Sequence, residues 1–144
     1  MLKIRSEQIE AFKPVAEAAF LRRVAEHLMA RHAGAVVRLS DRATTVKRLD
    51  DETLLTLVRG AVGRARGYGL RGESALAAFV VTMFLTSPNF DEHPLVRRAL
   101  TDKNVPPDAK MARLLQTITA KNLKVVKDSY DPSAWQPEGA GGGA

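Results

Sequence analysis

The segment ESALAAFVVTMFLTSPNFDEHP, residues 73–94, constrains this chain more than any other. Between positions 75 and 85, eleven consecutive residues include a single polar side chain, Thr82. A helix on the surface of a globular protein carries a polar face, so this pattern predicts a helix buried on nearly all sides. The run is too short to cross a bilayer, which takes roughly 20 apolar residues. We therefore expect a central helix at about residues 73–86, with the rest of a small domain packed around it.

The residues after this run predict where the central helix ends and how the next one begins. Pro88 cannot extend a helix, because it has no backbone N–H and its ring clashes with the preceding turn. Phe90 is expected to anchor the following loop in the core. Asp91 is expected to cap a short helix that begins at Pro94, a residue type suited to the first helical position.

The composition is that of one soluble globular domain. Of the 144 residues, 45% are hydrophobic and 26% are charged, so wholesale disorder is not expected. The chain has no cysteine, which excludes disulfides, thiolate metal sites and cysteine catalysis. The first twelve residues contain no apolar leader segment, and we expect a cytoplasmic protein with no membrane contact.

The first helix is expected to begin at Ser6, a good N-cap, and to stop at Gly34. Pro14 should kink this helix without shifting the phase of its apolar positions. Those positions follow helical spacing and form one stripe: Ile9, Phe12, Ala16, Ala19, Phe20, Val24 and Leu28.

A second helix is expected after Asp50, whose side chain is well placed to cap it. Gly60 and Gly63 lie within this helix, where each costs roughly 1 kcal/mol relative to alanine, and a close helix crossing is one reason to find them there. Residues 35–50 are harder to assign, and a short helical turn capped by Ser40 or Asp41 is one alternative. The apolar face of the second helix consists of Leu54, Leu57, Val58, Ala61, Val62 and Ala65.

The last long helix is expected to open at residues 107–108 and to end near residue 127 or 128. Residues 129–144 finish in GAGGGA and predict a flexible tail. No alternating strand pattern is present. The sequence therefore predicts an all-α protein with one domain of five or six helices, residues 1–128, and a tail, residues 129–144. The apolar face of the last helix should contain Met111, Leu114, Leu115, Ile118 and Val125.

Positive charge is concentrated outside the central helix. The chain has a net charge of +6, and residues 94–127 alone carry eight basic and two acidic side chains. A smaller group of arginines, at positions 59, 64, 66 and 71, precedes the central helix. On the last helix the basic face could be simply solvated, could follow nucleic-acid phosphates, or could meet an acidic protein surface. That face lies within about 120° of arc and consists of Lys110, Arg113, Lys121, Lys124 and Lys127.

The sequence offers no catalytic, cofactor-binding or metal-binding residue. Asp91, Glu92 and His93 together could suggest a metal or acid–base site, but zinc needs three or four ligands and no further ligand is tied to this loop by spacing. His27 and His32 are five positions apart, so a straight helix does not place them on one face. Capping and anchoring are the favoured roles for the loop.

Several segments of the chain resemble segments that occur in the same order in a known protein family. IRSEQIEAF, RARGYGL, ESALAAFVVTMFLTSPNFDEHP and KMARLLQTI resemble small bacterial helical proteins found in gene neighbourhoods of type VI secretion spike and PAAR-type effector proteins. The resemblance covers about residues 2–120 and implies an accessory, adaptor, chaperone or immunity-like binding role without a catalytic mechanism. Pro14 and the polar region 38–48 depart from the family pattern.

The leading hypothesis is a non-enzymatic protein that binds the acidic surface of a protein partner, such as a secretion effector or spike component. The alternative is a nucleic-acid-binding module that uses the basic face of the last helix, and an enzyme ranks third. The residues expected to bind the partner are Asn89, Glu92 and His93 in the loop, with Lys110, Arg113, Lys121, Lys124 and Lys127 on the last helix.

Overall fold

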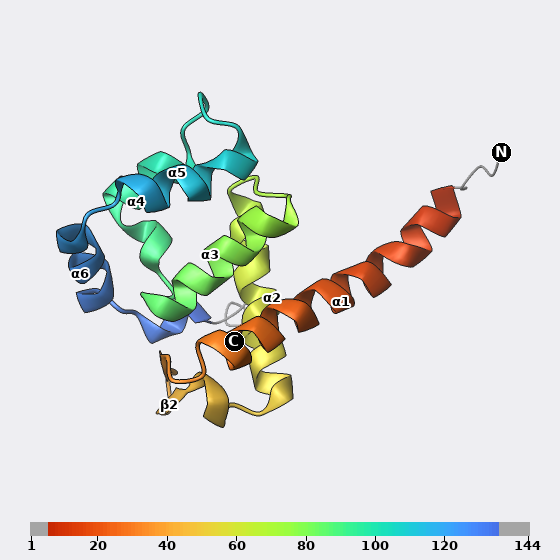
Figure 1. Ribbon diagram of the computed structural model, residues 1–144, viewed down its shortest axis with the longest axis horizontal. Coiled ribbons are helices and arrows are strands. Elements are labelled where there is room, and N and C mark those ends of the chain that lie inside the picture. Colours follow the sequence, from red (N-terminus) through yellow and green to blue (C-terminus); the bar gives the residue numbers. More distant parts are fainter. Residues whose placement is uncertain (1–5, 136–144) are drawn as a thin grey trace.

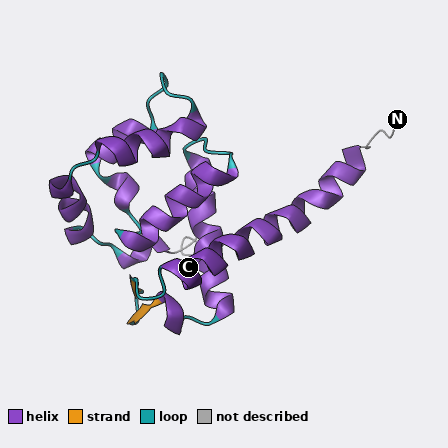
Figure 2. Ribbon diagram, viewed as in Figure 1, coloured by secondary structure: helices purple, strands orange, loops and turns teal. Residues whose placement is uncertain are grey.

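A computed structural model describes the backbone of residues 6–135 and the side chains of residues 16–135. The described residues form six α-helices and one small hairpin (Figures 1 and 2), which confirms the predicted all-α class. No helix among them is both long and apolar enough to cross a membrane. The helices are α1 (Ser6–Arg31), α2 (Asp51–Gly67), α3 (Glu73–Leu85), α4 (Pro94–Leu100), α5 (Lys110–Thr117) and α6 (Ala120–Asp128). The hairpin strands are β1 (Val36–Arg38) and β2 (Ala43–Thr45), and the short 3-10 turns are η1 (Val46–Arg48), η2 (Phe90–Glu92), η3 (Pro107–Ala109) and η4 (Pro132–Trp135).

Helix α3 is the predicted central helix, and its place in the core is confirmed. It lies between α2 and α5 and also meets α1 (Figure 1). The ring of Phe79 is fully buried, 4.9 Å from the ring of Phe90, which anchors the following loop as expected. The start of α3 is held by a residue distant in sequence, because Asp108 accepts hydrogen bonds from the backbone N–H groups of Arg71 and Gly72. A Cβ atom at Gly72 would lie 3.0 Å from Asp108 Oδ2, so glycine permits this close approach.

Helix α2 begins and packs as the sequence predicts. The Asp50 side chain accepts hydrogen bonds from the backbone N–H and hydroxyl of Thr53, which satisfies a free donor of the first turn. The helix ends at Gly67, and Gly69 follows with a positive φ of 87°, a conformation that glycine adopts without strain. All six predicted apolar positions are buried: Leu54, Leu57, Val58, Ala61, Val62 and Ala65.

Helix α1 runs through Pro14 to Arg31, so it ends before Gly34. Phe20, Val24 and Leu28 of the predicted stripe are buried, but Ala16 and Ala19 are exposed. The side chains of Ile9 and Phe12 lie outside the described residues.

The region 35–50 forms an antiparallel hairpin followed by the 3-10 turn η1, and not the helical turn capped by Ser40 or Asp41 that was considered from the sequence. Val37 is fully buried and pairs with Thr44 at the centre of the two short strands. Ser40 and Asp41 lie in the connecting turn and cap no helix. Strands of three residues are too short to leave a visible alternation in the sequence.

The predicted last helix is wrong as a single element, because the chain breaks between α5 and α6. Ile118 has an extended backbone, and the hydroxyl of Thr119 accepts a hydrogen bond from the N–H of Asn122 to cap α6. The break rotates α6 relative to the predicted face, so that Val126 is buried while Val125 is 45% exposed.

Residues 129–135, here called the C-terminal strap, were expected in the flexible tail but pack on the core. Trp135 is buried with its ring 4.7 Å from that of Phe84. The Tyr130 hydroxyl accepts hydrogen bonds from the Arg38 backbone N–H and from Trp135 Nε1. The folded part therefore extends past the predicted boundary at residue 128, because burying the indole ring outweighs the cost of ordering the strap. Residues 136–144 of the predicted tail lie outside the described residues.

Candidate functional site: an arginine-lined cleft

A cleft of about 940 Å³ lies between α2, the η2 turn, α4 and the C-terminal strap. Its volume exceeds that of four other pockets in the described part of the chain, and it combines charged groups with uncharged walls. Arginines from two helices line it, Arg59 and Arg64 from α2 and Arg97 from α4. Ser133 and Ala134 of the strap form part of its wall. We define these surroundings as the arginine cleft.

An ion-pair cluster fixes the cleft wall formed by the η2 turn. Arg64 Nε donates to both carboxylate oxygens of Asp91 at 2.9 Å, and Arg64 Nη2 donates to Glu92 Oε2 at 2.9 Å. The Tyr68 hydroxyl donates to Asp91 Oδ2 at 2.7 Å. Asp91 is only 2% exposed, so its charge depends on these donors for stabilisation in place of water.

The surroundings of this cluster shift two pKa values. Burial by itself would lower the pKa of Arg64, but the hydrogen bonds and charges of Asp91 and Glu92 outweigh burial and raise it. Burial, followed by the hydrogen bond to Asp91 and its charge, raises the pKa of Tyr68 above its ordinary value of 10.0. Arg64 therefore stays charged and Tyr68 stays a neutral hydroxyl that donates to Asp91.

This geometry suits positioning better than proton transfer. A general base needs a lone pair directed at the proton that it removes. Both oxygens of Asp91 already accept hydrogen bonds from Arg64, and one of them also accepts from Tyr68. The cluster thus holds the η2 turn against α2 and leaves the other cationic groups of the cleft to meet a ligand.

Arg59 and Arg97 are exposed, and neither forms an ion pair or side-chain hydrogen bond within the part of the chain whose side chains are described. The wall of α2 in the same cleft includes Gly60, Gly63 and Gly67, which share one helical face. A Cβ atom at Gly63 or Gly67 would meet nothing within 4 Å. At Gly63, therefore, no close helix crossing of the kind considered from the sequence is present.

The three loop residues predicted to bind a partner all take part in contacts within the chain. Asn89 Nδ2 donates to the Ser129 carbonyl and Asn89 Oδ1 accepts from the Asp131 N–H, which fastens the strap. Glu92 pairs with Arg64 and lines the cleft. His93 Nδ1 accepts from the Leu95 N–H and so caps α4. The predicted capping role of Asp91 is wrong, because its buried carboxylate is bound to Arg64 and Tyr68.

The predicted basic face of the last helix is not continuous. Lys110 is buried, and its Nζ donates to the Leu100 carbonyl at 2.7 Å, so it cannot contribute to an exposed face. Arg113 is exposed on α5, on the other side of the helix break. The exposed lysines of α6 are Lys121, Lys124 and Lys127, of which Lys124 pairs with Asp128.

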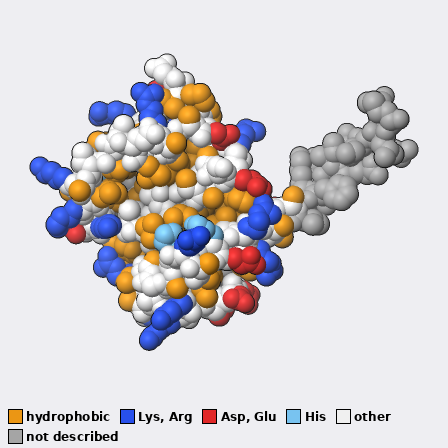
Figure 3. Space-filling view, in the orientation of Figure 1, with side chains coloured by type: hydrophobic (Ala, Val, Ile, Leu, Met, Phe, Trp, Pro, Cys, Tyr) orange, Lys and Arg blue, Asp and Glu red, His pale blue; other side chains and the backbone are white. Residues whose placement is uncertain are grey.

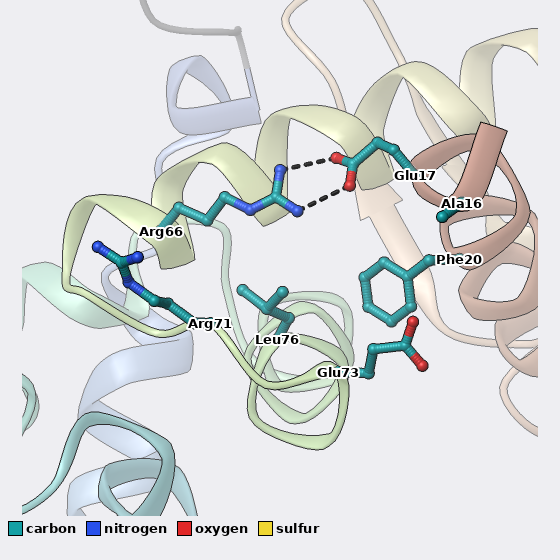
Figure 4. A pocket seen from close by; sticks show the side chains of 7 residues that line it. All are labelled: Ala16, Glu17, Phe20, Arg66, Arg71, Glu73 and Leu76. Carbon is teal, nitrogen blue, oxygen red and sulfur yellow. Dashed lines mark hydrogen bonds and ion pairs between the residues drawn. The ribbon is translucent and has the colours of Figure 1, made fainter. Parts of the chain in front are cut away.

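A second pocket of about 570 Å³ lies where α1, α2 and α3 meet (Figure 4). Figure 4 shows Arg66 pointing at Glu17, and each of its two terminal nitrogens donates to one carboxylate oxygen at 2.7 Å. The hydrogen bonds from Arg66 lower the pKa of Glu17. This pair largely neutralises its own charge, so the pocket offers a ligand less net charge than the arginine cleft.

The two histidines of the first helical region lie closer together than the helical spacing predicts. Their ring centroids are 5.5 Å apart, because α1 ends at Arg31 and His32 leaves the helical path. No group of three or more potential metal-ligating side chains occurs among the residues described.

Comparison with models of protein families, with curated proteins and with solved structures gives no match. The resemblance to proteins of type VI secretion neighbourhoods therefore stays a prediction. Of the cleft residues, the sequence marked Glu92 as a binding residue and Arg59 and Arg64 as part of a basic group, but not Arg97. The signal that could have located the cleft is the set of glycines inside α2, which weaken a helix that is otherwise strongly amphipathic.

Proposed function

We propose that this protein is a non-enzymatic binding protein that receives an acidic segment of a partner protein in the arginine cleft. The observation that carries the proposal is the pair of exposed guanidinium groups, Arg59 and Arg97, on two helices that line one cleft. Arginine binds carboxylates through two parallel hydrogen bonds, which gives geometric specificity as well as charge attraction.

The uncharged wall of the cleft supports a peptide as the ligand. Gly60, Gly63 and Gly67 add no side chain to the cleft wall, so a ligand backbone can approach the helix closely there. The fixed Arg64 cluster adds rigidity, and its one guanidinium and two carboxylates leave it with a net charge of −1. Arg59 and Arg97 bring the charge of the cleft lining to +1 (three arginines against two carboxylates). An extended acidic segment would lie along this wall with its carboxylates directed at Arg59 and Arg97.

The resemblance noted in the sequence suggests which partner to test first. It implies a type VI secretion effector or spike component, for which this chain would act in the cytoplasm as an adaptor, chaperone or immunity-like protein. Nucleic acid is the alternative ligand. It is less favoured because a groove that tracks nucleic-acid phosphates needs a longer basic surface, and the break between α5 and α6 divides the predicted one.

The test is a pair of double variants that change the net charge equally. Arg59→Glu with Arg97→Glu alters the cleft, and Arg48→Glu with Arg98→Glu alters exposed arginines that do not line it. Each is titrated against fluorescein-labelled hexaglutamate by fluorescence anisotropy and is also co-purified with a candidate type VI secretion effector or spike protein. We expect at least about a tenfold loss of affinity for the cleft variant and less than about threefold for the control.

Two outcomes would contradict the proposal. Equal losses in both double variants would indicate diffuse charge attraction in place of a site. Tighter binding of a single-stranded oligonucleotide than of hexaglutamate, with a steep dependence on log[salt], would favour the nucleic-acid alternative.

A further inference from the structure

The central helix α3 has an outer face that is apolar, although it is partly open to solvent. Leu85 is 44% exposed, Ser74 is exposed, and Ala77, Ala78 and Val81 are partly buried. At 100° per residue these five positions fall within roughly 100° of arc, so they form one stripe along the helix. A surface helix normally carries polar side chains on such a face. We call this stripe the outer face of α3.

A groove borders the outer face where α1 crosses it. Its volume is about 230 Å³, and it is lined by Phe20, Arg23, Val24 and His27 of α1 and by Glu73, Ser74, Ala77 and Val81 of α3. Arg23 Nη2 donates to Glu73 Oε2 at 3.0 Å, so the charges of this pair balance. Figure 3 shows the side of the molecule that carries α3, with hydrophobic side chains in its middle and most lysine and arginine side chains around its margin. An apolar area with a charged rim is typical of a protein interaction site.

We infer that the outer face of α3 and the groove beside α1 bind an amphipathic helix of a protein partner, with its flanking positions acidic. This surface shares no lining residue with the arginine cleft, so the inference does not rest on the function proposed above. It would give the protein a second binding surface. This surface would bind the apolar face of a helix, whereas the arginine cleft would bind carboxylates.

A helix is favoured as the occupant because of the size and spacing of the side chains. Ala77 and Val81 are small, lie one turn apart along α3 and line the groove, with the larger Phe20 and His27 on the bordering helix. Ridges of one helix pack into grooves of this kind on another, and small residues allow the two axes to approach closely. Recognition through an apolar helix face laid in a groove is a recurrent mode of peptide binding.

The charge of the chain decides between a foreign helix and a second copy of this protein. The net charge of the chain is +6, so two copies that met through this surface would repel each other. A helix with acidic flanks would instead be attracted by this net charge and would associate faster.

The probe for the experiment is a fluorescein-labelled peptide of about 18 residues, long enough to cover α3 as a helix. It has leucine and alanine on one helical face and glutamate on the other, and a second peptide has lysine in place of glutamate. We expect the acidic peptide to bind at least about tenfold more tightly than the lysine peptide. Val81→Glu and Leu85→Glu should each weaken the acidic peptide by about tenfold or more, and the half-exposed position of Leu85 makes the second variant safe for folding.

The matched control is Leu95→Glu on α4, where the leucine is 38% exposed and lines neither site. It should change peptide affinity by less than about threefold, as should the Arg59→Glu with Arg97→Glu double variant. Loss of binding in that double variant would place the peptide in the cleft and overturn the inference. Equal affinity for the two peptides, no binding of either, or sedimentation as a dimer that Leu85→Glu dissociates would also overturn it.

Discussion

Helix α3 and the C-terminal strap meet in the core through the rings of Phe84 and Trp135, yet they are held there in different ways. Helix α3 buries apolar side chains along most of its length, including Leu76, Phe79 and Met83. The strap buries the indole ring of Trp135, partly buries the ring of Tyr130, and otherwise depends on a few directional hydrogen bonds.

This difference indicates which part of the molecule can unfold locally while the rest stays folded. Apolar burial spread over a whole helix can be lost only when the domain unfolds, because neighbours on every side share the same contacts. A strap fastened by a few bonds can detach locally, at a free energy below that of global unfolding. Trp135 is the only tryptophan in the chain, so its fluorescence reports on the strap alone.

The largest expected effect comes from truncating the centre of α3. Phe79→Ala should lower the free energy of unfolding by roughly 3–5 kcal/mol, since the buried ring packs against Phe90 and Tyr68 and its removal leaves a cavity. Urea denaturation followed by far-UV circular dichroism measures the change. Leu85→Ala on the exposed side of the same helix should cost less than about 1 kcal/mol. Similar losses of unfolding free energy in both variants would mean that the two sides of α3 do not differ in burial.

A smaller and more local effect is expected from Asn89→Ala, which removes both hydrogen bonds between the loop and the strap. These bonds together contribute roughly 1–3 kcal/mol to docking of the strap. The tryptophan fluorescence of the variant should move to longer wavelength at a lower urea concentration than the circular dichroism signal changes. Asn104→Ala, at an exposed position, is the control and should leave both curves in place. Coincident fluorescence and circular dichroism transitions in Asn89→Ala would show that the strap unfolds only with the core.

The smallest expected effect separates ring packing from hydrogen bonding at the edge of the core. Tyr68→Phe keeps a ring beside Phe79 but removes the hydroxyl that donates to Asp91. It should cost roughly 0.5–1.5 kcal/mol at pH 7. Because the pKa of Tyr68 is raised in the folded protein, above about pH 10 the unfolded chain releases a proton that the folded chain keeps. The contribution of the hydroxyl is therefore complete below pH 10 and decreases as the pH rises.

Urea denaturation of the parent and Tyr68→Phe proteins at pH 7, 9 and 11 measures this dependence. The difference in free energy between the two proteins should shrink from pH 9 to pH 11, since titration of the remaining groups is largely common to both and cancels. A difference that stayed constant or grew with pH would contradict the assignment of the hydroxyl as the donor to Asp91.

The elements that the sequence predicted correctly are those whose signals are local. Asp50 caps α2 through residues within four positions of it, and the six apolar positions of α2 follow from helical spacing alone. The end of α3 near Pro88 depends on the chemistry of the adjacent turn. The break at Thr119 also has a local cause, a capping hydroxyl, but the basic and apolar spacing on both sides looked continuous and concealed it.

The candidate site was predicted less well because its parts come from three segments that are distant in sequence, residues 56–68, 91–97 and 133–134. The sequence marked Glu92, Arg59 and Arg64, but it could not pair Arg64 with Asp91, which lies 27 positions away. The sequence predicted that Lys110 lies on the surface because lysine is charged. Its contact with the Leu100 carbonyl arises only when α5 packs against α4, and the sequence does not show that packing.

The sequence by itself determined the helical class, the central helix and the amphipathic face of α2, because hydrophobic periodicity and capping act within a few residues along the chain. Only the tertiary structure decided that residues 129–135 join the core, that the three arginines line one cleft, and that the outer face of α3 is left partly open. These outcomes depend on which distant surfaces meet. Burial of apolar area is not directional. The pattern of apolar residues along the sequence therefore predicts which side chains are buried, but not which side chains they contact.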